Sequence, residues 1–542
     1  MTRPATVRQG PTHDDWIATL YHGSHALDTG PGRVRLSRVV GVVLAVVLLV
    51  AAVIGGIDLS RAGAPAPPPA RVAVQTRQPA SAASVLSGSP AAVSAGLARL
   101  LLASAPSAVV ADAASTRDVT AASAIARRVR APLLLMSVPA GTAAGASAVR
   151  SAIKALGTQT VLTVGVAGHA LTAGLPRVKL VTSATALPSA AAGVPQRGVA
   201  VLVHVGHSAA AAVLDTAAAA TAQMAGARVV DLPGFDPQTD PAAISELAAA
   251  RPSRVIAVGA RFGSVPLLTS RLAVAETGVQ LPGGGQVLFP MRRIVALYGN
   301  PGTPALGALG EQDLAASISR ARSVAAQYSA LSKVPVIPAF EIIATVAERS
   351  PGPSGTYSDE MSVAALRPWV RAATKAGMYV TLDLQPGRAN FLAQARHYQS
   401  LLRLPDVGLA LDPEWKLGPH QLPLHQIGSV GIAEVNSVVT WLARLTAQYR
   451  LPQKLLELHE FRLTMIGDIR QLDTRHQDLA VVINMDGQGA PSTKQQTWAA
   501  VVAGAPSGVF FGWKDFYVKD TPMLGPRATL LHEPQPMLIS YQ

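Results

Sequence analysis

Two carboxylates stand at the end of a short apolar run in the stretch 407–415, which reads VGLALDPEW. We interpret the run as a buried strand whose tip carries Asp412 and Glu414. Because side chains alternate along a strand, the two carboxylates are expected on the same side of that tip. Two carboxylates placed together can act as acid and as nucleophile or base in the cleavage of a glycosidic bond.

The chain around this stretch has the pattern of a barrel. Eight short apolar segments, most of them separated by helical patterns, lie within residues 291–542, a length that suits a (β/α)8 barrel. The expected strands are 294–297, 334–340, 378–382, 407–411, 454–458, 479–483, 508–512 and 536–540. Between the last two strands, and after the eighth, no helical pattern is visible, so the barrel is expected to be irregular where it closes.

Polar residues gather at the C-terminal ends of seven of these strands, which is where such barrels place their chemistry. The residues expected to contact a substrate are Tyr298, Glu341, Gln385, Trp415, His459, Asn484, Asp486, Trp513 and Lys514. Asp383, Asn300 and Glu457 share the inward parity of this set. Several acidic groups together with aromatic rings suit a carbohydrate, because aromatic faces stack on sugar rings.

A divalent cation is a competing use of these groups. Carboxylates and an imidazole are suitable ligands, and the candidates are Asp383, Asp412, Glu414, His459 and Asp486. The sequence has no HxH or HExxH spacing, so we expect no metal and no other cofactor. The chain also has no cysteine, which excludes disulfides and thiolate chemistry.

The N-terminal part of the chain has the pattern of a membrane anchor. Residues 39–57 are 19 apolar or glycine residues without a charge, enough for a helix of ~28 Å. Three arginines precede them, so the positive-inside rule places a disordered tail, 1–38, in the cytoplasm and the rest of the chain outside the cell. A signal peptide cleaved near 62–64 is the alternative. A linker rich in proline and alanine, 58–93, is expected to follow.

Residues 94–286 alternate between apolar strands and helices, which predicts a parallel-sheet αβ domain with covered faces. The stretch 116–165, with APLLL and then ALG and VLTVG, resembles the cell wall-binding repeat 2 family. That resemblance implies αβ units that attach a protein to anionic wall polymers. The net charge of +14 agrees with an anionic partner, whereas no dense basic cluster with interleaved aromatics indicates nucleic acid.

The D-x-E strand tip is similar to the tips of several glycoside hydrolase barrels, including chitinase-like and lysozyme-like ones, so residues 291–542 resemble a glycoside-hydrolase-like TIM barrel. This likeness implies that Glu414 is the proton donor and that Asp383 or Asp412 raises its pKa and stabilises the transition state. Stretches such as VTLDLQPGR, LALDPEW and FGWK also resemble an uncharacterised family of actinobacterial membrane-anchored envelope proteins.

Together these patterns predict a single-pass cell-membrane protein whose extracytoplasmic barrel binds a cell-wall glycan. Two hypotheses stay open for the barrel. In the first it is a glycoside hydrolase that cleaves the bound glycan. In the second it is a pseudo-enzyme, and the chain is a non-catalytic wall-binding or scaffolding protein. Release of reducing ends from wall polymers separates the two hypotheses.

Overall fold

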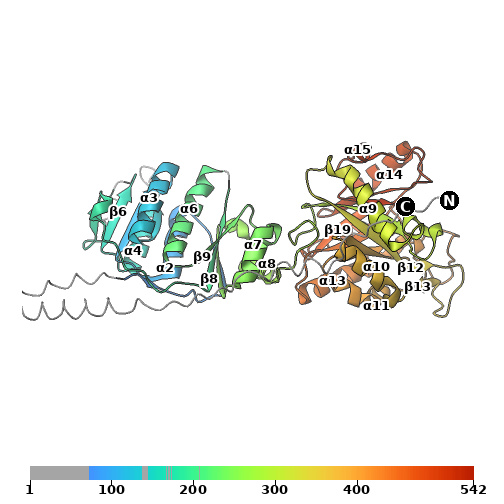
Figure 1. Ribbon diagram of the computed structural model, residues 1–542, viewed down its shortest axis with the longest axis horizontal. Helices are drawn as coiled ribbons and strands as arrows, with labels where there is room; N and C mark the ends of the chain where they lie inside the picture. The colour runs from blue at the N-terminus through green and yellow to red at the C-terminus, as the bar shows by residue number, and fades with distance from the viewer. Residues whose placement is uncertain (1–72, 137–143, 167, 169–170, 172–173, 207) are drawn as a thin grey trace, which may run out of the picture. The chain divides into compact units, whose positions relative to one another are not determined.

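The computed structural model describes residues 73–542, apart from 137–143, 167, 169–170, 172–173 and 207 (Figure 1). The expected cytoplasmic tail and the expected transmembrane helix at 39–57 lie outside the described residues. Within the described part of the chain, every helix is too short or too polar to cross a membrane.

Residues 73–286 contain two parallel sheets of four strands each (Figure 1). The first has the order β5-β4-β6-β7, with β4 Ser107–Asp112, β5 Leu133–Met136, β6 Thr160–Val164 and β7 Lys179–Val181. The second has the order β2-β10-β8-β9, with β2 Ala83–Leu86, β8 Val199–His204, β9 Arg228–Leu232 and β10 Arg254–Val258. The predicted parallel pairing is confirmed, since every strand pair within these two sheets is parallel.

Helices connect and cover these strands. They are α2 Pro90–Leu101, α3 Thr116–Val129, α4 Ala144–Ala155, α6 Ala209–Met224, α7 Pro241–Ala250 and α8 Val265–Ala275. Strand β2 pairs with β10 although its residues fall within 58–93, which we predicted to be a linker. The fold therefore begins earlier in the chain than predicted, because four residues of edge strand give too short an apolar pattern to be recognised. Another two-stranded pair joins β1 Gln75–Thr76 to β3 Leu102–Ser104.

Residues 293–542 form a closed barrel of eight parallel strands, as predicted. The strands are β11 Arg293–Gly299, β12 Val336–Ala347, β14 Tyr379–Leu384, β15 Val407–Leu411, β17 Lys454–His459, β19 Leu479–Met485, β20 Phe510–Asp515 and β21 Leu538–Tyr541. Each pairs with the next, β21 pairs with β11, and β11 pairs with β12, which closes the ring.

The helices around the barrel are α9 Leu314–Ser329, α10 Val363–Lys375, α11 Phe391–His397, α12 Gln399–Leu402, α13 Ile432–Gln448, α14 Pro491–Gly504 and α15 Pro526–Thr529. The expected irregularity at closure is confirmed, because the connection from β20 to β21 contains only the four-residue helix α15. The connection from β17 to β19 also lacks a long helix and holds a short strand, β18 Ile466–Gly467, and a 3-10 turn at Ile469–Gln471. Short elements complete the unit: β13 Ser358–Glu360 and β16 Val430–Gly431.

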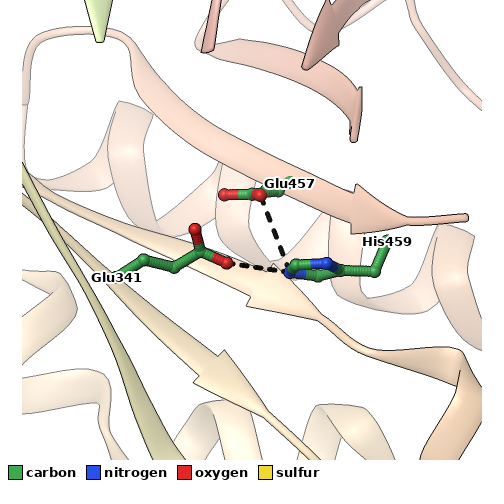
Figure 2. A group of neighbouring side chains, drawn as sticks. All are labelled: Glu341, Glu457 and His459. Carbon is green, nitrogen blue, oxygen red and sulfur yellow. Dashed lines mark ion pairs between the residues drawn. The ribbon is translucent and has the colours of Figure 1, made fainter. Parts of the chain in front are cut away.

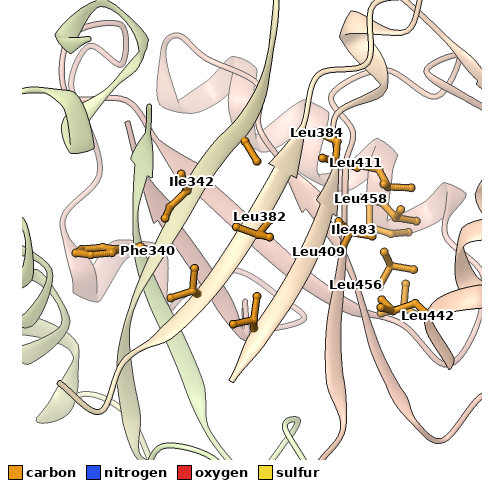
Figure 3. Close-up of a cluster of buried hydrophobic side chains, with 14 of the residues drawn as sticks. Phe340, Ile342, Leu382, Leu384, Leu409, Leu411, Leu442, Leu456, Leu458 and Ile483 are labelled. Atoms are coloured by element: carbon orange, nitrogen blue, oxygen red, sulfur yellow. The ribbon is translucent and has the colours of Figure 1, made fainter. Parts of the chain in front are cut away.

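Alternation along the strands separates two environments. Outward side chains such as Leu409 and Leu456 join helix residues such as Leu442 in the main hydrophobic core (Figure 3). Inward side chains form layers, with an apolar layer that includes Ile294 and Leu455 at the N-terminal ends of the strands. Above it the inward residues are mostly small: Ala296, Ala339, Thr381, Ala410, Gly512 and Ser540. These small residues leave room inside the barrel for long polar side chains of the layer above.

Candidate active site

Seven barrel strands each direct a polar side chain inward at or just beyond their C-terminal ends. These side chains are Tyr298, Glu341, Asp383, Asp412, His459, Asn484 and Lys514, and each is at most 2% exposed. The structure thus brings together residues that lie up to 216 positions apart in the sequence, from Tyr298 to Lys514. Their convergence follows from strand alternation and from the closure of the sheet, because equivalent positions on neighbouring strands face the same axis.

The deepest part of the cluster, which we call the deep group, consists of Glu341, Glu457 and His459 (Figure 2). His459 Nε2 lies 2.9 Å from Glu341 Oε1 and 3.6 Å from Glu457 Oε1. Asp383 Oδ1 lies 3.9 Å from the same nitrogen. All three members of the deep group have fully buried side chains, so their charges interact in a region from which water is largely excluded.

Three hydrogen bonds fix the orientation of side chains in and around the deep group. His459 Nδ1 donates to Asp486 Oδ2 at 3.1 Å, and Asn484 Nδ2 donates to Glu457 Oε1 at 2.6 Å. The Tyr298 hydroxyl donates to Asp383 Oδ2 at 2.8 Å. Several oxygens nevertheless have no hydrogen-bond partner among the described residues. They are Glu341 Oε2, Glu457 Oε2, Asp383 Oδ1, Asp412 Oδ1, Asn484 Oδ1 and Asp486 Oδ1.

A second set of carboxylates, which we call the outer group, consists of Asp412, Glu414 and Asp486. One oxygen from each lies within 4.8 Å of the others. Asp412 is 1% exposed and Asp486 6%, whereas Glu414 is only partly buried. Glu414 is therefore the carboxylate of the outer group that an external molecule reaches most easily.

The two residues of the D-x-E stretch meet for a reason other than the predicted one. Strand β15 ends at Leu411, and Pro413–Trp415 form a 3-10 turn rather than a continued strand. Proline at 413 lacks an N–H and so cannot continue the parallel ladder. The turn, with Lys416 N donating to Pro413 O at 3.0 Å, is what carries the Glu414 carboxylate to Asp412. The expected proximity is correct, but strand alternation does not produce it.

Burial raises the pKa of several of these carboxyl groups. The pKa of Glu414 rises to about 7 through burial and the nearby charge of Asp486. That of Asp383 rises to about 6, mainly through burial, although the positive charge of His459 opposes the change. Burial and the charges of Glu414 and Asp383 raise the pKa of Asp412 well above its usual range. A proton therefore stays on part of this cluster at neutral pH.

Two cations face the carboxylates. Burial lowers the pKa of His459, but its hydrogen bond to Asp486 and its close contact with Glu341 outweigh this effect, and the net change is upward. Burial also lowers the pKa of Lys514. Nearby carboxylates, among them Glu341 and Asp486, raise it, and the net change is upward. Lys514 Nζ also lies 3.3 Å from the centre of the Tyr298 ring. Six carboxyl groups face these two cations: Glu341, Asp383, Asp412, Glu414, Glu457 and Asp486.

Not every predicted contact residue lies in the cluster. Trp513 follows the opposite parity from Lys514 and packs outside the barrel against Trp498 and His532. Its Nε1 donates to Asp515 Oδ1 at 2.7 Å, and the residue is fully buried. The prediction that Trp513 contacts a substrate is therefore wrong, because the strand directs its ring away from the barrel axis.

The remaining predicted residues lie at the edge of the cluster. Gln385 Nε2 donates to the Tyr298 hydroxyl at 3.4 Å, and its Oε1 accepts from Ala347 N. Trp415 is partly exposed, and its Nε1 is buried without a hydrogen-bond partner among the described residues. Asn300 donates instead to the Ile343 carbonyl, which closes the loop after β11. Trp415 is thus the aromatic residue best placed to meet a molecule that approaches Glu414.

The structure places two further acidic residues, Glu457 and Glu460, in or beside the cluster, and the sequence did not predict a role for either. Glu457 shares the inward parity, but only the structure shows that it lies beside His459 and Glu341. Glu460 is 1% exposed, both of its carboxylate oxygens lack a partner among the described residues, and burial raises its pKa to about 7. The alternation in Glu457-Leu458-His459 indicates that Glu457 points inward, whereas Glu460 breaks this alternation and has no comparable sequence signal.

Comparison of the chain with protein-family models, with curated proteins and with solved structures found no match.

Proposed function

We propose that the barrel hydrolyses a glycosidic bond in a cell-envelope glycan, with Glu414 as the proton donor. The observation that carries this proposal is the outer group, in which one partly exposed carboxyl group with a pKa of about 7 lies beside two buried carboxyl groups. A proton donor must hold its proton near the working pH, and a pKa close to 7 meets that requirement.

The spacing of the outer group favours a reaction in two steps. Oxygens that all lie within 4.8 Å of one another are closer together than the ~6.5–9.5 Å of inverting glycosidases, which leave room for a water molecule between the carboxyl groups. Asp486 is the better nucleophile of the two partners, because its Oδ2 accepts from His459 while its Oδ1 remains free. Asp412 has a strongly raised pKa, which favours its neutral form.

In the first step Asp486 Oδ1 forms a bond to the anomeric carbon while the bond to the leaving oxygen breaks, and that oxygen takes the proton of Glu414. In the second step the ionised Glu414 removes a proton from water, and the hydroxide displaces Asp486 from the sugar. The configuration of the anomeric carbon is retained because it is inverted twice. Trp415 stacks on the sugar ring at the entrance to the site.

The cellular setting of the proposal is the outer face of a cell membrane. It depends on the apolar stretch 39–57, which would anchor the chain, and on the net charge of +14, which would favour anionic wall polymers. The αβ part, 94–286, would contribute wall binding through the repeat-like units that its sequence resembles. In the alternative, the chain binds the wall and its barrel catalyses no reaction.

The test is release of reducing ends by the full-length protein, purified in detergent, from peptidoglycan, arabinan and galactan. Glu414→Gln removes the transferable proton at nearly unchanged volume, so we expect the rate to fall by about 10³-fold or more. Glu311→Gln is the matched control, because Glu311 is an exposed barrel carboxylate paired with Arg320. Its rate should equal that of the wild type.

The rate should also fall as the pH rises through about 7, because Glu414 loses its proton there. Polymers bound equally by the wild type and by Glu414→Gln, with no reducing ends released by either, would support the non-catalytic alternative and exclude hydrolysis.

A further inference from the structure

We propose that the deep group, Glu341, Glu457 and His459, binds one divalent transition-metal ion inside the barrel. This is a different conclusion from the sequence prediction, which expected no metal because no metal-binding motif is visible. The proposal does not rest on glycoside hydrolysis. It concerns residues one layer below the outer group, and its ligands come from two strands that are far apart in the sequence.

The distances within the deep group are those of ligands around one ion. The ligand atoms lie within 4.8 Å of one another, with separations of 2.9 and 3.6 Å from His459 Nε2 to the two glutamate oxygens. Metal–ligand bonds of about 2.0–2.1 Å place neighbouring ligand atoms about 3.0 Å apart at right angles and about 3.4 Å apart in a tetrahedron. Figure 2 shows both carboxylates directed at the same ring nitrogen.

Buried oxygens without partners provide an independent reason for a cation. Glu341 Oε2 and Glu457 Oε2 are enclosed in a fully buried region and accept no hydrogen bond from any described residue. A buried carboxylate oxygen is normally paired, because it has lost its contact with water. The amide oxygen of Asn484 is also buried without a partner beside Glu457. Glu341 Oε1 and His459 Nε2, the atoms that an ion would contact directly, are also buried without a hydrogen-bond partner among the described residues. A bound ion would satisfy these two atoms, and water in its remaining positions would satisfy the other acceptors.

The hydrogen bonds around the deep group are those expected next to a metal. His459 Nδ1 donates to Asp486, which fixes the ring so that Nε2 faces the two glutamates. Asn484 holds Glu457 in the same way through a bond of 2.6 Å. Metal-binding histidines almost always donate their second ring N–H to a carboxylate or carbonyl, which orients the ring and strengthens the ligand.

A protonated His459 is the competing explanation. An imidazolium ion would account for the 2.9 Å contact with Glu341, but it carries a single charge and has no third N–H for Glu457. Two glutamates and the nearby Asp383 would then share one positive charge from the ring and one from Lys514. A divalent ion in place of the proton on Nε2 balances the two glutamates. One imidazole and two carboxylates suit manganese, iron or zinc better than calcium or magnesium.

The test begins with the metal content of the wild-type full-length protein, measured by inductively coupled plasma mass spectrometry. After treatment with EDTA, the protein is titrated with Mn²⁺ and with Zn²⁺ in a calorimeter. We expect one equivalent per chain and release of a proton on binding, because the ion replaces the proton on His459. A wild-type protein that contains no metal and binds neither ion overturns the proposal.

Two variants locate the site. Glu341→Gln and Glu457→Gln each remove one ligand charge, so the affinity should fall by about 100-fold or more, whereas Glu311→Gln should bind as the wild type does. Equal affinity in all four proteins would place the ion elsewhere and overturn the proposal. If either variant fails to fold by circular dichroism, Asp486→Asn replaces it, since it keeps all three ligands and should weaken binding about 10- to 100-fold.

Glu414→Gln separates this proposal from the proposed function. It leaves the three ligands intact, so it should abolish hydrolysis and bind the metal with unchanged affinity. If the wild type binds one ion but releases no reducing ends, the metal site is supported and glycoside hydrolysis is excluded.

Discussion

The deep group and the outer group lie in the same barrel and are linked by Asp486, yet their environments suit different tasks. The deep group is fully buried, combines nitrogen with oxygen, and has its side chains held by Asp486 and Asn484. The outer group contains only carboxylates, and Glu414 is partly exposed. The comparison shows that a difference in burial can give two parts of one acidic cluster different roles. Full burial favours holding an ion, and partial exposure favours contact with a substrate.

The origin of the side chains differs as well. Glu341, Glu457 and His459 lie within strands β12 and β17, whose ladders fix their backbone on both sides. Asp412 and Asp486 directly follow strands, and Glu414 belongs to a 3-10 turn. Residues on strands are held more rigidly than residues on connections. A rigid deep group and a more adjustable outer group agree with the two tasks.

The largest expected effect comes from Asp486, a member of the outer group that also accepts a hydrogen bond from His459 of the deep group. Asp486→Asn keeps the shape of the side chain but removes the charge that faces His459 and the nucleophile of the outer group. We expect the rate of glycan hydrolysis to fall by about 10³-fold or more, and the metal affinity by only about 10- to 100-fold. Reducing-end release and calorimetric titration measure the two quantities on one preparation.

Equal losses in both measurements would contradict the division into two groups and would indicate a single site. Glu311→Gln again controls for the loss of a barrel carboxylate, because Glu311 lies on the surface.

The next prediction concerns stability and pH. The pKa of Glu460 beside the cluster is raised from 4.5 to about 7 in the folded state, so the unfolded state ionises first as the pH rises. The stabilisation is complete below pH 4.5 and is lost as the pH rises through 7. It amounts to about 3 kcal/mol, or roughly 5–10 °C in melting temperature for a barrel of this size.

Thermal unfolding followed by circular dichroism at pH 5 and pH 8 measures this effect. The wild type should melt at a lower temperature at pH 8, and Glu460→Gln should reduce the difference because glutamine does not titrate. Equal differences in the wild type and in Glu460→Gln would show that Glu460 does not titrate between pH 5 and pH 8 in the folded protein.

The smallest expected effect concerns the support of the deep group by Asn484. A methyl group on Gly512 would lie 2.8 Å from Asn484 Oδ1, so Gly512→Ala should displace the amide that holds Glu457. We expect the metal affinity to fall by about 3- to 10-fold, in line with modest overpacking, and hydrolysis to change by less than about twofold. Gly525→Ala is the control, because its methyl group would meet no atom within 4 Å.

A larger loss of hydrolysis than of metal affinity in Gly512→Ala would mean that Asn484 acts on the outer group instead.

The sequence by itself determined the architecture of the barrel. Apolar runs separated by helical patterns located all eight strands, because a strand covered on both faces must be apolar almost throughout. Parity along each run also identified the inward residues, since the period of two is a property of the backbone. This reasoning was not applied to Trp513, which was expected to contact a sugar as an aromatic residue next to Lys514, although its parity directs it outward.

Tertiary structure decided how the acidic residues divide into two groups. The placement of Glu457 against Glu341 depends on strands β12 and β17, which are more than 100 residues apart in the chain and are separated in the barrel by β14 and β15. The position of Glu414 depends on the turn that Pro413 begins. Local pattern cannot supply either distance, because contacts across a barrel are set by register and closure. Burial, which separates the deep group from the outer group, likewise exists only after the strands have closed.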